Sequence, residues 1–200
     1  HRAYVLVGDK FKDISEPTYN DPSKIRTVIS ADFDNDGYDE IFMNNIGEPN
    51  KLFKILEGGK FEEIKIKNAL ETFGLGTGAA VADVDDDGIL ELLISHGETG
   101  LQPLTLYKAD IEDFNYLRIK PLSKYGAPAR GATVTLRSNM RIHSKTIDAG
   151  SGYLCQMEPV AHYGIRQNEK NIQVEIKWTD GSTKSLNIDD LNKTYEIKQN

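Results

Sequence analysis

The chain has 200 residues, of which 38% are hydrophobic and 28% charged, and its formal net charge is −7. This composition is typical of a globular protein and allows one domain or two. The negative charge disfavours nucleic acid binding, which relies on clustered Lys and Arg, and no apolar run approaches the ~20 residues of a membrane-spanning helix. The single cysteine, Cys155, excludes an internal disulfide framework and does not decide the compartment.

Residues 1–20 are typical of the end of a β unit. A strand is predicted at Tyr4 to Val7, followed by a turn and by a second strand that begins at Phe11. The chain begins at His1 and not at methionine, and no signal peptide is visible. We therefore expect that a targeting segment or a longer N-terminal region has been removed or left out.

Two independent features recur at nearly the same spacing. The Phe-x-x-Ile segment that begins at Phe11 returns at Phe61, and an acidic loop that begins at Asp32 returns at Asp83. This periodicity indicates an internal repeat, and three or four short strands in about 50 residues is the size of a propeller blade. The predicted strands are 27–31, 41–43, 52–56 and 61–64 in the first copy and 79–82, 92–95 and 104–107 in the second, with polar turns at 44–50 and 96–102.

From Asn115 the repeat ends, and the alternating pattern predicts a small all-β domain of about 85 residues. No stretch has helical periodicity over more than two turns, so we expect little helix. We divide the chain into a repeat region at 1–112 and a second domain at 113–200. The predicted strands of the second domain are 116–120, 133–136, 145–147, 173–178, 184–188 and 195–197.

The acidic loops carry carboxylates at positions one, three, five and nine and a glycine at position six. Crowded carboxylates repel one another unless a cation holds them, and ligation by oxygen alone favours calcium over zinc or copper. Glycine permits the sharp turn that brings a main-chain carbonyl at position seven towards the ion. The predicted ligands of two calcium ions are Asp32, Asp34, Asp36, the Tyr38 carbonyl and Glu40 in the first loop, and Asp83, Asp85, Asp87, the Ile89 carbonyl and Glu91 in the second.

Other interpretations of these loops stay open. An EF-hand is disfavoured, because position twelve holds Met43 or Ile94 instead of glutamate and the flanks are β-rich. A solvated acidic turn without an ion is the plain alternative, since Asp, Asn and Gly are common turn formers. A third possibility is that one loop has lost affinity: Leu90 stands where the first loop has Asp39, so the two loops differ in nearby charge.

Several motifs resemble known families. Residues 31–37 and 82–88 resemble the core of the FG-GAP, or VCBS, repeat of integrin α-chain propellers and many secreted proteins. Four segments in order resemble the ASPIC/UnbV domain, namely 126–132, 150–156, 162–165 and 176–181. The resemblance implies an all-β fold, with propeller-type FG-GAP blades in a partial or open array followed by a small β-sandwich or barrel-like C-terminal domain. It also implies the calcium ligands named above.

The chain departs from the family pattern at two points. Arg166 stands where the family usually has a second glycine, so we expect that turn to differ. A closed propeller needs at least four blades, whereas this chain has two loops and the end of a preceding unit. The chain is therefore either a fragment or an open stack that is capped by the C-terminal domain and by a partner.

Catalytic interpretations of other residues are weaker. Cys155 and His162 could form a thiol–imidazole pair, but a buried small residue and a histidine bonded to a turn are the expected roles. The glycine-rich segment 74–78 leads into a strand and not into a phosphate-binding helix, so it predicts close backbone packing. Trp178 is expected in the core at a strand end, with a carbohydrate platform as the minor alternative.

The leading hypothesis is a non-enzymatic calcium-binding β-repeat protein that acts as a protein-interaction or scaffolding module. Calcium would fix the strand–loop–strand turns, and an incomplete repeat array would leave sheet edges for a protein partner or larger assembly. We expect an extracytoplasmic location: secreted, on the cell surface or in an organelle lumen. The alternatives are a peripheral structural subunit of a membrane-associated complex and a polysaccharide-acting enzyme with structural calcium.

Overall fold

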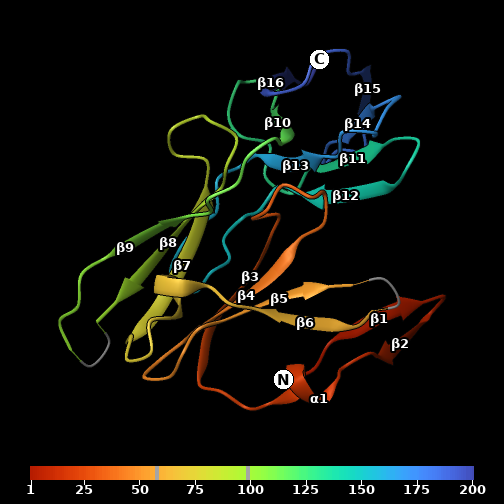
Figure 1. Cartoon of the computed structure of the whole chain (residues 1–200). Coiled ribbons are helices and arrows are strands. Elements are labelled where there is room, and N and C mark those ends of the chain that lie inside the picture. The colour runs from red at the N-terminus through yellow and green to blue at the C-terminus, as the bar shows by residue number, and fades with distance from the viewer. Residues whose placement is uncertain (57–58, 98–99) are drawn as a thin grey trace.

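The computed structural model describes residues 1–56, 59–97 and 100–200, and nearly all of its regular structure is β-strand (Figure 1). The repeat region holds β1 Tyr4–Val7, β2 Lys10–Asp13, β3 Ile25–Ala31, β4 Glu40–Asn45, β5 Lys51–Ile55, β6 Phe61–Ile64, β7 Gly76–Ala82, β8 Glu91–His96 and β9 Thr105–Lys108. The C-terminal region holds β10 Asn115–Leu122, β11 Thr133–Arg137, β12 Ile142–Thr146, β13 Ala161–Ile165, β14 Gln173–Lys177, β15 Thr183–Asn187 and β16 Lys193–Lys198.

Over residues 1–56, 59–97 and 100–200, helix is limited to one turn in each of two places. These are α1, Pro17–Asn20, and the 3₁₀ helix Lys67–Leu70. Neither they nor any other helix of the described residues has the length and apolar character needed to cross a membrane. The low helix content predicted from the sequence is confirmed.

The two copies of the repeat form two separate antiparallel sheets. The first has the order β3-β4-β5-β6 and the second the order β7-β8-β9. In the part of the chain that the structure describes, the second sheet has no fourth strand, which agrees with the change of composition at 110–114. Strands β1 and β2 form a separate hairpin beside the first sheet (Figure 1). Within the described residues, no sheet closes on itself into a barrel.

The first repeat sheet is packed on both faces. On one face, Ile29 and Phe42 share a core with Leu92 and Ile94 of the second sheet. On the other face, a smaller cluster contains Tyr19, Met43, Phe53 and Phe61, with Tyr19 stacked on Phe61 at a ring-centroid distance of 4.3 Å. Because both faces of the sheet are covered, five of the six residues of β4 are buried.

The outward face of the second repeat sheet is partly exposed in the described structure. Leu93 and Leu106 are cross-strand partners, and they are 38% and 55% exposed. The equivalent position to Leu93 in the first sheet is Phe42, two residues after the closing glutamate of the loop, and that side chain is fully buried against the second sheet. Among the described residues, the face that carries Phe42 is therefore covered by the second sheet, whereas the equivalent face that carries Leu93 is partly exposed.

The C-terminal region is a β-sandwich. One sheet has the order β13-β10-β16, in which β10 and β16 run parallel, and the other has the order β12-β11-β14-β15. The buried side chains of the two sheets form one core, which includes Leu117, Val134 and Ile176. Trp178 is 5% exposed and donates its indole N–H to the Leu122 carbonyl at 3.0 Å, as expected for a core residue at a strand end.

The structure corrects some sequence predictions. The polar turn predicted at 44–50 begins too early, because Asn44 and Asn45 belong to β4 and are buried. Asn44 donates to the Gly78 carbonyl, and the Asn45 N–H donates to the Asn50 side chain. Asn44 Oδ1 accepts no hydrogen bond among the described residues. Strand β13 and helix α1 were not predicted. Part of the turn predicted at 96–102 lies outside the described residues.

Candidate metal centres

Both acidic loops occupy the same place in their repeats, between the first and second strands of each sheet. The first connects β3 to β4 and the second connects β7 to β8. Asn35 and Asp86, at position four, have positive φ angles of 54° and 58°. Gly37 and Gly88, at position six, have φ angles of 95° and 86°, which glycine adopts without strain. The two loops therefore share one backbone conformation.

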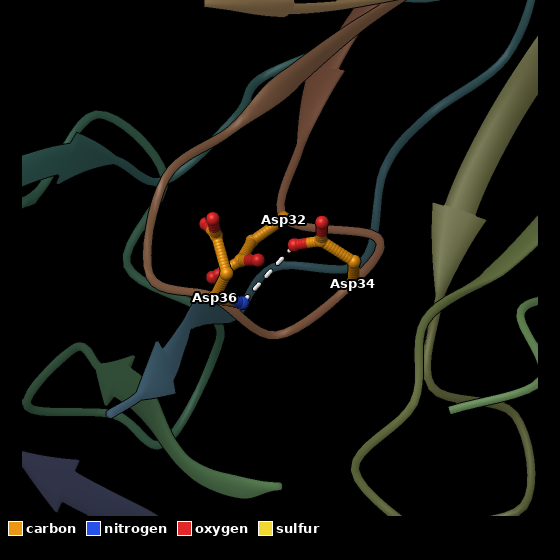
Figure 2. A group of neighbouring side chains, drawn as sticks. All are labelled: Asp32, Asp34 and Asp36. Atoms are coloured by element: carbon orange, nitrogen blue, oxygen red, sulfur yellow. Dashed lines mark hydrogen bonds between the residues drawn. The ribbon is translucent and has the colours of Figure 1, made fainter. Parts of the chain in front are cut away.

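The first loop gathers carboxylates from a single short turn (Figure 2). One oxygen each of Asp32, Asp34 and Asp36 lies within 4.8 Å of the other two. The turn is held by its own side chains, because the Asp36 N–H donates to Asp34 at 3.1 Å and the Gly37 N–H donates to Asp32 at 3.0 Å. Glu40 is not in this tight group, but the Lys54 ammonium forms ion pairs with Glu40 and with two members of the group, Asp34 and Asp36.

Two buried oxygens of the first loop lack a hydrogen-bond partner among the described residues. Asp32 and Glu40 are each 1% exposed, yet Asp32 Oδ1 and Glu40 Oε1 accept no hydrogen bond. Burial raises the pKa of Asp32 to about 6, and burial together with the charge of Asp34 raises the pKa of Glu40 to about 8. A bound divalent cation would supply the missing partner and stabilise both carboxylates.

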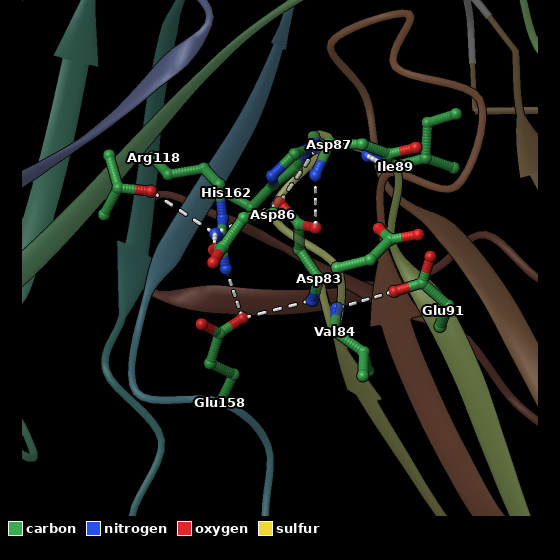
Figure 3. Close-up of polar contacts among 12 residues, drawn as sticks. Asp83, Val84, Asp86, Asp87, Ile89, Glu91, Arg118, Glu158 and His162 are labelled. Atoms are coloured by element: carbon green, nitrogen blue, oxygen red, sulfur yellow. Dashed lines mark hydrogen bonds and ion pairs between the residues drawn. The ribbon is translucent and has the colours of Figure 1, made fainter.

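The second loop has carboxylates at the same four positions, but a different three of them lie close together. One oxygen each of Asp83, Asp85 and Glu91 lies within 4.8 Å of the other two. Both oxygens of Asp83 accept backbone N–H groups, from Asp87 at 3.0 Å and Gly88 at 2.9 Å (Figure 3). Asp87 is absent from the tight group. The all-oxygen donor sets of both loops fit a hard cation such as calcium.

A lysine from the third strand of each sheet reaches into each loop. Lys54 Nζ lies 2.5 Å from Asp34, 2.7 Å from Asp36 and 3.6 Å from Glu40. Lys108 Nζ lies 2.8 Å from Asp85 and 2.7 Å from both Asp87 and Glu91. These are positions three, five and nine in both loops, so each ammonium lies among the predicted metal ligands.

The C-terminal domain covers the second loop with Arg118 of β10. This side chain is 2% exposed and lies 3.1 Å from Asp83 and 3.3 Å from Asp86, and it also pairs with Glu158 (Figure 3). Glu158 in turn accepts the Asp83 N–H at 3.2 Å. Arg118 is thus a buried cation shared by three carboxylates, two of them from the loop.

The C-terminal domain also covers the first loop, through β13 and the residue after it. The Gly164 N–H donates to Asp32 at 2.9 Å, and Arg166 Nε donates to the Asp36 carbonyl at 2.7 Å. The Arg166 guanidinium lies over the Tyr38 ring at 4.7 Å. Arg166, the departure from the family pattern, is therefore part of the contact between the domains.

A buried polar chain connects the two loops to each other. His162 Nε2 lies 2.7 Å from Asn35 Oδ1, and Asn35 Nδ2 donates to the Gly88 carbonyl at 2.8 Å. Because Asn35 Oδ1 can only accept, His162 donates from Nε2. Burial lowers the pKa of His162 to about 3, so the ring is neutral at physiological pH. This contact accounts for His162 without a catalytic thiol–imidazole pair.

Sequence reasoning missed three residues of these centres. Lys54, Lys108 and Arg118 lie far from the loops in sequence. The signal for the lysines was their position relative to the third predicted strand of each repeat, since Lys54 lies within 52–56 and Lys108 directly follows 104–107. Of the two residues predicted to ligate through the main chain, Tyr38 has a half-exposed ring and Ile89 is buried, and the role of their carbonyls stays a prediction.

Comparisons with known proteins agree with this architecture. Residues 32–94 match the family described as FG-GAP-like repeat, and residues 123–200 match the family described as ASPIC and UnbV. The chain thus has one segment that matches each of these two family models, in this order. The matches cover both acidic loops and most of the sandwich, so the family resemblance in the sequence is confirmed.

The chain is also similar to curated animal proteins named cartilage acidic protein 1. The human protein is 44% identical over 98% of this chain, and the mouse protein 42% identical over 98%. The chain spans about a third of the length of these relatives, 32% and 33%. Among solved structures, the Bacillus anthracis TIE protein aligns over 90% of this chain and 39% of its own at 13% identity, with a TM-score of 0.29.

Proposed function

We propose that this chain is a non-enzymatic, calcium-stabilised interaction module of an extracellular protein. The observation that carries the calcium part is the pair of buried oxygens, Asp32 Oδ1 and Glu40 Oε1, which lack a hydrogen-bond partner among the described residues and lie in an all-oxygen cluster. A buried carboxylate oxygen without a partner is costly, and a hard cation removes that cost.

In this proposal, the first-loop carboxylates Asp32, Asp34, Asp36 and Glu40 hold one ion, with the Tyr38 carbonyl as a further ligand. The equivalent residues of the second loop form the second candidate site. Calcium supplies charge neutralisation and a fixed loop geometry. Two residues of the C-terminal domain contact the loops directly. Gly164 and Arg118 bind the position-one aspartates and so dock that domain onto the loops.

A structural role for the ion is favoured over catalysis by its surroundings. The loops lie against the C-terminal domain, and the position-one and position-nine carboxylates are 5% exposed or less. Glycosidases instead present two carboxyl groups across an open cleft, about 5–9.5 Å apart. The tight groups here hold their oxygens within 4.8 Å, a spacing that suits shared coordination of one cation.

The interaction part rests on exposed apolar side chains and on the relatives. The β1–β2 hairpin exposes Tyr4, Leu6 and Phe11 at 57%, 59% and 73%, and the second repeat sheet exposes Leu93 and Leu106. Contiguous apolar surface of this kind marks interaction sites. The relatives are named as cartilage proteins, which supports an extracellular location for this chain.

Isothermal titration calorimetry with calcium tests the first part. The proposal expects saturable binding to the metal-free chain, abolished by Asp32→Ala combined with Asp83→Ala, and much weaker binding of magnesium, which prefers smaller octahedral sites. The absence of any calcium heat in a folded chain would contradict it.

The second part is tested with a photo-crosslinking residue at Leu93. In extracellular matrix extract, the proposal expects a crosslink that unlabelled wild-type chain competes away and the Leu93→Asp, Leu106→Asp variant does not. A crosslink that both competitors suppress equally, or none at this face and at the β1–β2 hairpin, would contradict an interaction role.

A further inference from the structure

The two lysines in the loops stand at equivalent positions of the two sheets. Lys108 is the cross-strand partner of Glu91 in the β8–β9 ladder. In the β4–β5 ladder Ile41 pairs with Phe53, so the next position places Lys54 opposite Glu40. Strand register therefore puts an ammonium beside the closing glutamate in both repeats.

The two loops differ in how many of their carboxylate oxygens have a hydrogen-bond or ion-pair partner within the protein. In the second loop, Lys108 lies 2.7 Å from Glu91, and Arg118 lies 3.1 Å from Asp83, which also accepts two backbone N–H groups. The remaining ligands, Asp85 and Asp87, have side chains that are 61% and 45% exposed, so water hydrates them.

In the first loop, the aspartate at position one has fewer partners, and the lysine lies farther from the glutamate at position nine. Lys54 stands 3.6 Å from Glu40, and no Lys or Arg of the described residues forms an ion pair with Asp32. Asp32 Oδ1 accepts no hydrogen bond among the described residues, whereas both oxygens of Asp83 accept one. Glu40 Oε1 and its equivalent Glu91 Oε1 both accept none, so the two glutamates differ in the distance to their lysine, 3.6 Å and 2.7 Å. Lys145 acts on Asp32 only at longer range, because its ammonium pairs with Asp39 at 2.6 Å.

We propose that the two loops are not equivalent cation sites. The first loop is the tight calcium site, whereas Lys108 and Arg118 complete the second loop without a divalent ion and keep its calcium affinity low. This inference rests on the proposed calcium function and assigns it to one loop. An ammonium is a single charge with three donors, so it satisfies three carboxylates without demanding the six to eight oxygens that calcium takes.

A matched pair of substitutions tests this assignment. Asp34→Asn and Asp85→Asn remove one charge at position three of each loop, and both side chains are partly exposed, so both variants are expected to fold. In calcium titration calorimetry we expect Asp34→Asn to weaken the tight site at least about tenfold and Asp85→Asn to change it less than about twofold. Wild-type chain should show one tight ion.

Removing the second-loop ammonium provides the converse test. Lys108→Met should add a second tight calcium ion, and Lys54→Met should tighten the first site without changing the stoichiometry. Should Lys108→Met fail to fold without metal, Lys108→Gln keeps a polar group there and is titrated in its place. Circular dichroism of each metal-free variant checks that the fold is retained.

The outcomes separate this inference from the proposed function. One tight ion that is sensitive to Asp34→Asn, with a second gained on removal of Lys108, supports the inference. Two ions of equal affinity in wild-type chain, or equal losses in the two asparagine variants, would overturn it and leave the calcium function standing. Calcium binding at neither loop would overturn both.

Discussion

His162 is a buried neutral imidazole at the junction of the two domains. Its Nε2–H donates to Asn35, and its Nδ1 is buried without a partner among the described residues. Burial lowers its pKa to about 3 from the 6.5 expected in the unfolded chain. Below pH 6.5 the unfolded chain binds a proton that the folded chain rejects, so folding stability falls as pH falls from 6.5 towards 3.

We therefore predict an acid-sensitive stability that depends on His162. Between pH 7.5 and pH 5 this residue should remove about 2 kcal/mol of the free energy of unfolding. His162→Gln keeps an amide N–H that can donate to Asn35 and does not titrate. Urea denaturation at both pH values should show a smaller loss for the variant, and equal losses in the two proteins would contradict this role.

Strand β13 is the element that joins the sandwich to the first loop. A Cβ added at Gly164 would lie 2.4 Å from the carbonyl carbon and 2.5 Å from the Cα of Asn35, so the two backbones approach more closely than a side chain allows. We predict that Gly164→Ala lowers the free energy of unfolding by about 1–3 kcal/mol, because the backbones of β13 and of the first loop cannot move apart without losing contacts.

The control is Gly100→Ala, where the added Cβ would meet only the terminal Leu75 Cδ1, at 3.1 Å. A flexible methyl can move aside, so this variant should change stability by less than about 0.5 kcal/mol. Denaturant titrations of both variants measure the difference. Equal stability of Gly164→Ala and wild-type chain would mean that β13 does not dock closely on the loop.

Most strands could be predicted from the sequence because they alternate or carry apolar runs between clear turn signals. Strand β13 could not, because all five of its residues are buried and His162 and Gly164 interrupt the apolar pattern. Its residues were recognised as a motif without being recognised as a strand. Asn44 and Asn45 read as turn residues, yet they are buried in β4, where specific side-chain hydrogen bonds outweigh their turn preference.

The acidic loops were located from the sequence because all of their carboxylates come from one short segment of chain. Their surroundings were not, since Lys54, Lys108 and Arg118 reach them only after strands pair and domains dock. The residues that cover the first loop follow it by more than a hundred positions. Contacts at that separation leave no local pattern in a single sequence.

At the scale of the whole molecule, Arg118 should be the main electrostatic link between the domains. Arg118→Met leaves Asp83 buried and Glu158 without this partner, and breaking a buried ion pair from one side costs about 3–5 kcal/mol. Lys120→Met, on the same strand, removes only an exposed pair with Glu196 and should cost about 1 kcal/mol or less. Denaturant titrations in the presence of calcium measure the free energy of unfolding of both variants. Similar losses of stability in the two would contradict a buried electrostatic link between the domains.

The most direct test of a calcium-stabilised module is scanning calorimetry of the chain with calcium and with a chelator. At a free calcium concentration of about one hundred times Kd, one bound ion adds about 2.7 kcal/mol, which corresponds to a rise in Tm of about 5–10 °C for a chain of this size. The account predicts that chelation lowers Tm by this amount and that added calcium restores it. An identical Tm under both conditions would contradict it.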